Sequence, residues 1–336
     1  MLYSLARSAL FRLDPEVAHD VALKSLGRMG AAASMLGPGE SRAESRRVMG
    51  IDFPNPVGLA AGLDKNGEYI DALGALGFGF VEIGTVTPRP QPGNPKPRIF
   101  RLVEDEAIIN RLGFNNLGVE RLLRNVERAS WKGVLGINIG KNFDTPIERA
   151  ADDYLACLDA VYAAATYVAV NISSPNTKNL RDLQSPERLG ELLGSVMRRG
   201  EALATRHGQR KPIAVKIAPD LDDEQIAAIA ALAIEHRVDA LIATNTTIAR
   251  DGIAGRSLAA ESGGLSGRPL FRRSTEVLAR LATAVAGKVP IVGVGGILSG
   301  SDARAKIDAG ASLVQLYTGF IYRGPALIAD ARKALR

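Results

Sequence analysis

Short apolar segments, many of them rich in β-branched residues, recur along the whole chain. Eight such segments occur, at residues 57–61, 80–86, 133–140, 167–173, 212–219, 240–247, 290–297 and 313–320. Nearly continuous apolar runs of this length are typical of strands that are buried on both faces. The pattern therefore predicts eight buried strands in a parallel sheet.

Amphipathic helical patterns separate the apolar segments. They cover residues 66–77, 118–129, 152–165, 185–208, 222–236, 272–287, 301–310 and 325–335. In the longest of them, Ser185 is expected to cap the helix and Pro186 to occupy its first position. Eight strands that alternate with helices predict an α/β fold and favour a TIM (β/α)8 barrel, with an open doubly wound sheet as the alternative.

Two connections, residues 87–117 and 248–268, are longer than a loop between a strand and a helix usually is. The first is rich in proline and ends in NRLGFNN, and the second is rich in glycine and serine. Long loops of this kind usually serve as lids or binding loops, which is the role expected here.

The first 45 residues lie outside the barrel pattern. Apolar residues at helical spacing predict one short helix, and Asp14 and Pro15 provide the cap and the first position of a second helix. Two such helices can pack on the barrel, plug its bottom, or lie in a membrane interface. The predicted organisation is a small N-terminal two-helix extension, residues 1–45, followed by the barrel, residues 46–336.

Composition narrows the class of protein. Of 336 residues, 46% are hydrophobic and 23% are charged, which is typical of a globular protein and excludes a disordered or collagen-like chain. The net charge is +6, but no block of five basic residues occurs and only 5% of residues are aromatic, so no nucleic-acid partner is expected. No apolar segment reaches the ~20 residues of a spanning helix, and Arg7 interrupts the apolar core that a signal peptide would need.

Cysteine and histidine are scarce. Cys157 is the only cysteine, which excludes an intramolecular disulfide, and it lies in a helical pattern where a packing role is expected. His19, His207 and His236 are far apart in the sequence, so no metal site is expected. The single cysteine and the lack of an export signal favour a reducing cytosolic compartment.

Polar residues stand where the predicted strands end, on the face of a barrel where chemistry takes place. Lys65 follows the first strand, Asn138 and Asn171 lie at the ends of the third and fourth, and Lys216 lies within the fifth. Loops often begin with polar residues, but lysine and asparagine inside apolar runs are costly unless they have partners. Their amides and positive charges suit a flat heterocycle and an anionic group.

Glycine-rich segments accompany the last strands: GGLSG at 263–267, GVGG at 293–296 and YTG at 317–319. Glycine lets backbone N–H groups approach a ligand closely, and a helix that starts nearby adds the positive end of its dipole. Since barrels often bind phosphate beside strands seven and eight, these segments predict a phosphate site.

None of the three histidines lies in these motifs, so a general base has to be found elsewhere. The loop after the fourth strand offers Ser173 and Ser174, just before Pro175. Serine is a weak base and needs a sequestered site and a proton relay, for which Thr177 and a water molecule are candidates. The sequence contains no GxSxG elbow, which argues against a serine hydrolase.

Eight motifs, in this order, carry a resemblance to a known family: AAGLDKNG, NRLGFNN, NISSPNT, KIAPD, ATNTT, GGLSG, GVGGI and YTGF. The chain resembles the class 2 dihydroorotate dehydrogenases, which are quinone-dependent, membrane-associated enzymes of de novo pyrimidine (UMP) biosynthesis. The resemblance implies a TIM barrel, FMN as cofactor, oxidation of (S)-dihydroorotate to orotate, and ubiquinone or menaquinone as the final acceptor. Serine at position 174, where class 1 relatives have cysteine, favours class 2.

The resemblance also implies roles for individual residues, with Ser174 as the catalytic base. The residues that match FMN contacts are Ala61, Gly62, Leu63, Asp64, Lys65, Thr85, Asn138, Asn171, Lys216, Thr244, Gly267, Gly296, Tyr317 and Thr318. The residues that match substrate contacts are Lys65, Asn110, Arg111, Leu112, Gly113, Phe114, Asn171, Asn176, Asn245 and Thr246. Lys216 is expected to favour negative charge on the reduced flavin.

By the same resemblance, quinone enters between the N-terminal helices, past His19 and Arg101 and toward Tyr317. No mitochondrial-type presequence precedes these helices. A peripheral protein on the lipid surface of the cytoplasmic face of the cell (inner) membrane, without an obligate protein partner, is therefore expected. Two alternatives stay open: a class 1 or other FMN barrel oxidoreductase, and a non-catalytic barrel that binds a phosphorylated ligand at a membrane surface.

Overall fold

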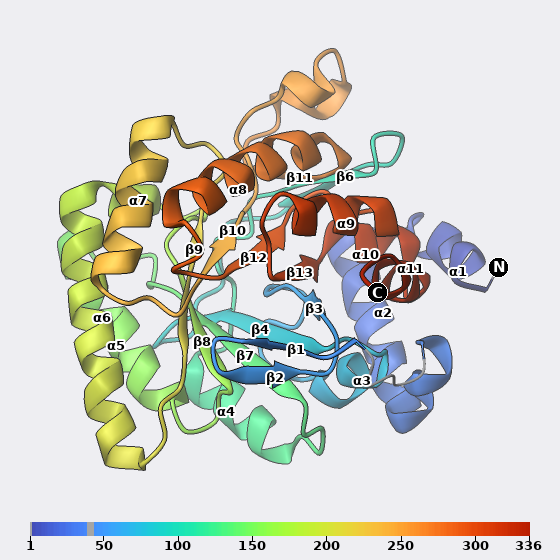
Figure 1. Ribbon diagram of the computed structural model, residues 1–336. Helices are drawn as coiled ribbons and strands as arrows, with labels where there is room; N and C mark the ends of the chain where they lie inside the picture. Colours follow the sequence, from blue (N-terminus) through green and yellow to red (C-terminus); the bar gives the residue numbers. More distant parts are fainter. Residues whose placement is uncertain (1, 39–43) are drawn as a thin grey trace.

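A closed barrel of eight parallel strands forms the centre of the molecule (Figure 1). The computed structural model describes residues 2–38 and 44–336. The barrel strands are β3 (Val57–Leu59), β4 (Phe80–Val86), β7 (Val134–Ile139), β8 (Tyr167–Asn171), β9 (Ile213–Ile217), β10 (Ala240–Ala243), β12 (Ile291–Val294) and β13 (Leu313–Leu316). They follow one another in chain order, and β13 pairs with β3 to close the barrel. The predicted TIM barrel is confirmed, and the open sheet is wrong.

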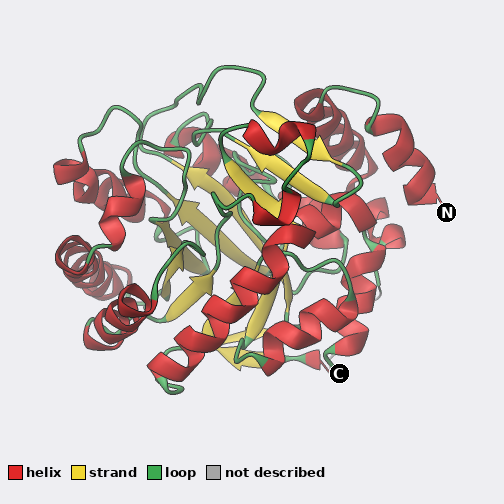
Figure 2. Cartoon of the chain, turned by 90° about the horizontal axis from the view of Figure 1, so that it is seen from above, coloured by secondary structure: helices red, strands yellow, loops and turns green. Residues whose placement is uncertain are grey.

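Helices surround the barrel, as the view from above shows (Figure 2). They are α3 (Ile70–Ala75), α4 (Val119–Arg128), α5 (Ala150–Val161), α6 (Pro186–His207), α7 (Asp223–Glu235), α8 (Phe271–Val285), α9 (Gly300–Asp308) and α11 (Ala326–Ala334). Ser185 occupies the N-cap position of α6, but its side chain makes no capping hydrogen bond within the described residues. Helix α7 has a complete capping box, in which Asp222 and Gln225 each accept a hydrogen bond from the other's backbone N–H.

A β-hairpin closes the barrel at the N-terminal ends of its strands. Its strands are β1 (Arg46–Val48) and β2 (Ile51–Phe53). Phe53 packs edge to face on Phe80, and Phe80 on Tyr167, with centroid distances of 5.1 and 6.4 Å. The bottom of the barrel is therefore filled by side chains of the hairpin and the strands, not plugged by the N-terminal helices.

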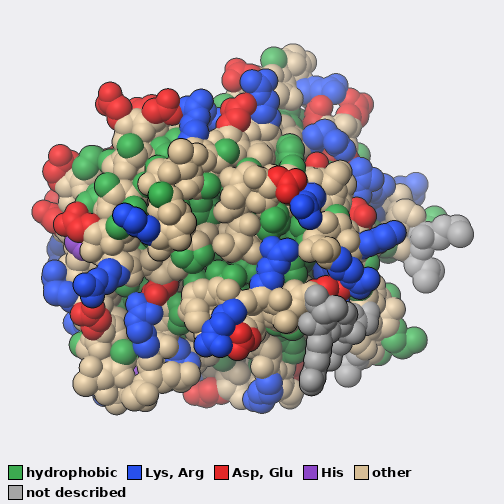
Figure 3. Space-filling view, in the orientation of Figure 1, with side chains coloured by type: hydrophobic (Ala, Val, Ile, Leu, Met, Phe, Trp, Pro, Cys, Tyr) green, Lys and Arg blue, Asp and Glu red, His purple; other side chains and the backbone are tan. Residues whose placement is uncertain are grey.

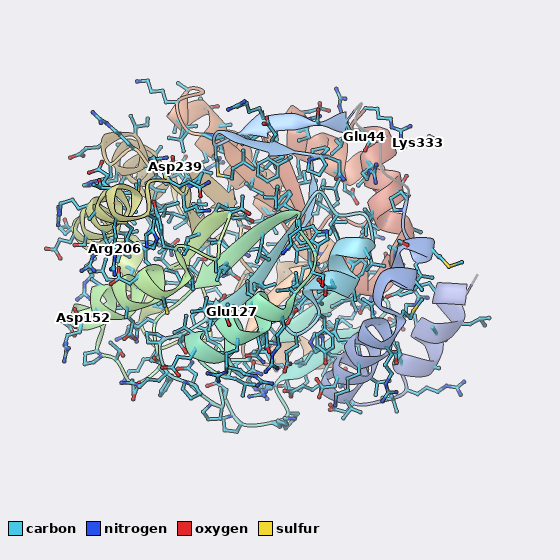
Figure 4. The ribbon with its side chains drawn as sticks, turned by 90° about the horizontal axis from the view of Figure 1, so that it is seen from below. Glu44, Glu127, Asp152, Arg206, Asp239 and Lys333 are labelled. Atoms are coloured by element: carbon cyan, nitrogen blue, oxygen red, sulfur yellow. The ribbon has the colours of Figure 1, made fainter. Side chains whose placement is uncertain are left out.

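A buried ion pair fixes the segment that leads into β1. Nε of Arg332, on α11, donates to the Glu44 carboxylate at 2.6 Å, and both side chains are almost fully buried. Arg336 contacts the same carboxylate at 2.7 Å. The view from below shows Glu44 beside this C-terminal helix (Figure 4).

The two long connections meet over the barrel and form a small antiparallel sheet that the sequence pattern did not predict. Its strands, in the order β11-β6-β5, are β5 (Ile99–Leu102), β6 (Ala107–Asn110) and β11 (Gly264–Gly267). Residues of both connections share one buried apolar cluster, which includes Leu102 and Leu265. The connections are thus fixed parts of the structure that hold motif residues at the mouth of the barrel.

The N-terminal helices stand to one side of the barrel, at the right of Figure 1. They are α1 (Leu2–Leu10) and α2 (Pro15–Met29), followed by η1 (Gly30–Leu36). Asp14 caps α2 as predicted, since its carboxylate accepts from the N–H groups of Glu16 and Val17 at 2.9 and 3.2 Å. Helix α1 lies against α10 (Thr318–Arg323), and α2 lies against α3 and β5.

The predicted division at residue 45 stays a prediction, and residues 1 and 39–43 of that extension lie outside the described residues. Within the described part of the chain, no helix combines the length and the apolar character needed to cross a bilayer.

Candidate active site

A cavity opens at the C-terminal ends of the barrel strands and is called here the first cavity. Every barrel strand except β7 contributes lining residues from its end or from the loop that follows. Most of the predicted site residues line it: Ala61, Gly62, Lys65, Thr85, Asn110, Leu112, Gly113, Phe114, Asn171, Ser174, Asn176, Lys216, Thr244, Asn245, Thr246, Gly267, Gly296, Tyr317 and Thr318.

Four predicted residues do not line this cavity, and each has a physical reason. Leu63 is buried and faces a second cavity. The Asp64 carboxylate is turned into its own loop, where it accepts from the N–H groups of Glu68 and Tyr69 at 2.9 and 2.7 Å. The Arg111 guanidinium is turned away, because it pairs with Glu261 at 2.6 Å. Direct ligand contacts by these side chains are therefore not supported.

Asn138, the fourth of these residues, lies beneath the cavity in a buried polar network. Its amide Nδ2 donates to Glu82 at 2.8 Å, and its Oδ1 accepts from the Thr85 hydroxyl at 2.6 Å. Asn171 donates in turn to Thr85 Oγ1 at 3.1 Å. The network fixes the planes of two asparagine amides, so Asn138 acts on the cavity through Thr85 and Asn171.

Two lysines bring positive charge to the cavity. Lys216 is almost fully buried in β9, and burial lowers its pKa while the negative charge of Glu82 opposes this effect. Burial likewise lowers the pKa of Lys65, and Glu16 opposes it. Both lysines are well placed to bind an anion, because a nearby negative charge favours their protonated form.

The two serines of the NISSPNT motif have different surroundings. Ser173 is fully buried, donates to Asn171 Oδ1 at 3.2 Å and accepts from Asn245 Nδ2 at 3.0 Å. Ser174 lines the cavity, and its Oγ accepts from the N–H of Asn176 at 3.2 Å. The hydroxyl proton of Ser174 has no acceptor among the described residues, which leaves this serine free to exchange a proton with a ligand.

Two hydroxyls near these serines are buried without a hydrogen-bond partner among the described residues, Thr177 Oγ1 and Thr246 Oγ1. Buried polar atoms without partners are rare in native proteins and commonly mark a ligand or water position. Thr246 lines the first cavity, so its hydroxyl is available to a bound molecule.

Glycines form one edge of the first cavity. Gly267, Gly295 and Gly296 have φ of +92°, +109° and +76°, a region that favours glycine. A Cβ on Gly296 would lie 2.4 Å from Cα of Phe271, so no side chain fits there. This edge exposes backbone to the cavity and matches the predicted phosphate site.

A second cavity lies between α1, α2, β5 and α10, and its walls are mostly apolar. His19, Arg101 and Tyr317 are among its polar residues, as the predicted quinone path requires. Burial lowers the pKa of His19 to about 3, and the charge of Lys65 acts in the same direction. The guanidinium of Arg101 lies 4.7 Å from the Phe11 ring centroid.

The two cavities adjoin, because Asn110, Leu112 and Tyr317 line both of them. Some lining residues were missed by the sequence analysis, namely Gln315 and Ser266 in the first cavity and Ile108 and Phe320 in the second. Gln315 could have been found, since it interrupts an apolar strand as Lys216 does. Ile108 could not, because its strand was not predicted.

A barrel mouth with a glycine-lined edge, two lysines and an adjoining apolar cavity is typical of the active site of a barrel enzyme. Comparison with known proteins narrows the class. A family model described as dihydroorotate dehydrogenase matches residues 44–336, and the chain belongs to this family, which is flavin-dependent.

Two relatives of high sequence identity match this chain over its whole length. A protein of Methylobacillus flagellatus is 62% identical over 336 residues, and one of Thiobacillus denitrificans is 64% identical over 340 residues. The alignments cover 100% of this chain in both cases, and 100% and 99% of those proteins. Both are named dihydroorotate dehydrogenase (quinone), and the predicted family and class 2 assignment are confirmed.

Solved structures support the same family assignment. The chain superimposes on the crystal structure of DHODH from Eimeria tenella in complex with ferulenol with a TM-score of 0.88 and 41% sequence identity. The match covers 96% of this chain and 90% of that one.

Proposed function

We propose that this chain oxidises (S)-dihydroorotate to orotate in the first cavity and delivers the electrons to a membrane quinone bound in the second. The observation that carries this proposal is the common wall of the two cavities, where Asn110, Leu112 and Tyr317 face both. A cofactor bound in the barrel mouth can thus exchange electrons with one reactant on each side. The reaction belongs to the formation of UMP in pyrimidine biosynthesis.

The residues of the first cavity fit FMN. The glycine edge suits its phosphate, and Lys216 suits an electron-rich ring, because a buried cation stabilises negative charge that reduction places there. Thr85, Asn171 and Thr244 offer hydrogen-bonding groups along the cavity wall. Held by these residues, FMN would supply an acceptor for the hydride of dihydroorotate C6 and a two-electron donor for the quinone.

The protein residues hold the substrate and remove its proton. Asn110, Asn176 and Asn245 present amides that match the ring N–H and C=O groups of dihydroorotate, and Lys65 provides a charge for its carboxylate. Asn176 Nδ2 donates to Asn110 Oδ1 at 3.2 Å, so these two amides are held relative to each other. The unpartnered hydroxyl of Thr246 adds a further contact.

Ser174 takes the proton from C5 as the hydride leaves C6. A serine hydroxyl is a weak base, and it works here only if its own proton is passed on. Thr177, buried and without a partner for its hydroxyl among the described residues, is the proposed next member of this relay, with water beyond it.

The N-terminal helices are the proposed membrane contact. Apolar side chains exposed on and beside them are Leu5, Leu13, Val17, Val21, Met29, Met35 and Leu36. Arg12, Lys24 and Arg28 are exposed on the same segment and suit an anionic lipid surface. Elsewhere, basic and acidic side chains are intermixed over the face in view (Figure 3). The proposed location is peripheral, on the cytoplasmic face of the cell membrane.

One set of measurements tests the proposal. The purified protein should be yellow, and dihydroorotate should bleach the flavin under anaerobic conditions. Reoxidation should be fast with ubiquinone or menaquinone analogues and slow with fumarate or NAD. A colourless protein would favour the non-catalytic barrel, and reoxidation by fumarate or NAD would favour a class 1 enzyme.

A further inference from the structure

A lysine that lines neither cavity is buried behind the glycine edge of the first cavity. Lys306 lies on α9 and is fully buried. No carboxylate forms an ion pair with it in the described part of the chain. A buried ammonium group without a paired anion is costly, and such groups occur mainly where they serve a function.

Lys306 is connected to the glycine edge through one side chain. Its Nζ donates to Ser274 Oγ at 2.6 Å and lies 5.1 Å from the ring centroid of Phe271. Ser274 Oγ lies 3.0 Å from two carbonyl oxygens, those of Gly295 and Phe271, so its single proton is shared between these two acceptors. Helices α8 and α9 and strand β12, which carry these residues, lie side by side (Figure 1).

The direction of the Gly295 carbonyl decides what this connection does. A trans peptide points its C=O and the next N–H in opposite directions. Since the Gly295 oxygen points outward to Ser274, the N–H of Gly296 points the other way, and Gly296 lines the first cavity. Hydrogen bonding at the carbonyl end polarises the peptide and strengthens its N–H as a donor.

We propose that Lys306 is a positioning residue for the phosphate group of FMN, and that it acts through Ser274 and the Gly295–Gly296 peptide as the positive charge behind the phosphate site. The inference rests on the proposed function, because it takes FMN to be the ligand. The two lysines that line the first cavity do so from the loop after β3 (Lys65) and from β9 (Lys216), whereas Gly295 and Gly296 follow β12.

The charge state of Lys306 adds a second consequence. Burial lowers its pKa to about 7, and Asp302, one turn earlier on α9, opposes this effect. Of the other charged residues on the helices packed on α9, Lys333 is exposed, and the rest have partners of their own: Arg272, Arg273, Glu276, Arg280, Asp330 and Arg332. Phosphate binding should raise the pKa of Lys306, so FMN should bind with uptake of a proton between pH 7 and 9.

The test compares FMN with riboflavin, which lacks only the phosphate. Both are titrated into the flavin-free full-length chain and followed by flavin fluorescence. Lys306→Met should weaken FMN binding by about 10- to 100-fold and leave riboflavin binding unchanged. The matched control is Lys141→Met, which removes another buried lysine whose Nζ donates to the Asn142 and Thr145 carbonyls, and it should leave the FMN-to-riboflavin ratio unchanged.

Two further measurements decide the matter even if Lys306→Met does not fold. Ser274→Ala should weaken FMN binding by about 2- to 10-fold, again without effect on riboflavin. In the wild-type chain, the preference for FMN over riboflavin should fall as pH rises from 7 to 9, above the second pKa of the phosphate, near 6. Lys65 and Lys216 face the part common to both flavins, so their titration cancels in this ratio.

Equal losses for FMN and riboflavin would make Lys306 a purely structural residue and overturn the inference. An unchanged ratio in Ser274→Ala together with no pH dependence would do the same. A wild-type chain that did not prefer FMN to riboflavin would instead overturn the FMN assignment itself.

Discussion

The two cavities share a wall, yet they are built in different ways. The first is surrounded by the ends of buried barrel strands, and its polar groups are fixed by neighbours such as Thr85 and Asn138. The second lies between helices on the side of the barrel, where α1 is held by contacts such as Arg7 to the Tyr322 carbonyl at 2.8 Å. Proton and hydride removal require fixed geometry, which a sheet provides, whereas an apolar carrier that enters and leaves is served by a wall of helices.

The largest expected effect lies in the first cavity. Ser174→Ala should slow flavin reduction by dihydroorotate roughly 10²–10⁴-fold, because it removes the general base, while FMN stays bound. Anaerobic stopped-flow absorbance measures this step, and quinone should reoxidise the pre-reduced variant at the wild-type rate. Ser173→Ala is the control and should be milder, since Ser173 faces Asn171 and Asn245 rather than a ligand. Wild-type flavin reduction in Ser174→Ala would rule out this serine as the base.

Much of this first region could be predicted from the sequence. An apolar run predicts a strand, and the polar residues at its end are predicted to lie at the barrel mouth, because the C-terminal ends of all eight strands meet there. The pattern does not show whether a polar side chain at a strand end faces the cavity or only forms hydrogen bonds with other residues. Asn138 stands at a strand end as Asn171 does, and both make hydrogen bonds to the protein, but only Asn171 lines the first cavity.

The non-local parts of the fold could not be predicted. Strand β11 pairs with β6 through Gly264 and Asn110, which are far apart in the chain and carry no periodic signal. The N-terminal helices were predicted from their spacing and from the Asp14 cap. The apolar residues of these helices, however, did not show which side chains face the second cavity and which face solvent, because apolar side chains occur on both sides of the helices.

The next effect concerns the floor of the first cavity. Glu82 is fully buried and accepts from Asn138, Tyr167 and Gln315 at 2.7–2.8 Å. Glu82→Gln should lower the free energy of unfolding by about 2–4 kcal/mol, because it replaces one of the two accepting oxygens by an NH2 donor and leaves Lys216 without its opposite charge. Urea unfolding measures this change.

The control for Glu82 is Asp52→Asn on β2. Asp52 is exposed and lies 3.7 Å from Arg47, so its loss should cost less than about 1 kcal/mol. A comparably small change in Glu82→Gln would mean that the network is not the rigid support described above.

A smaller effect tests the outer side of the second region. Val17 and Val21 on α2 are 49% and 42% exposed and do not line the second cavity. Changing both to Glu should weaken binding to anionic vesicles about tenfold or more, while flavin reduction by dihydroorotate stays at the wild-type rate. Vesicle sedimentation measures the binding. Phe143→Glu with Ile248→Glu is the matched control, because both residues are exposed on loops of the barrel. Equal losses in the two double variants would contradict the proposed membrane contact.

The smallest effect distinguishes the charges of the two cavities. The first holds lysines, whereas burial keeps the imidazole of His19 in the second neutral, with a pKa of about 3. Between pH 6.5 and 3 the unfolded chain binds a proton at His19 that the folded chain does not, so stability falls as pH drops through this range. His19→Gln should therefore reduce the loss of unfolding free energy between pH 7 and 5.5 by about 1 kcal/mol, measured by urea unfolding. The exposed His207 provides the control, since His207→Gln should leave the pH dependence unchanged. If His19→Gln also left it unchanged, His19 would be charged in the folded protein, and the second cavity would be less suited to an apolar carrier than its walls indicate.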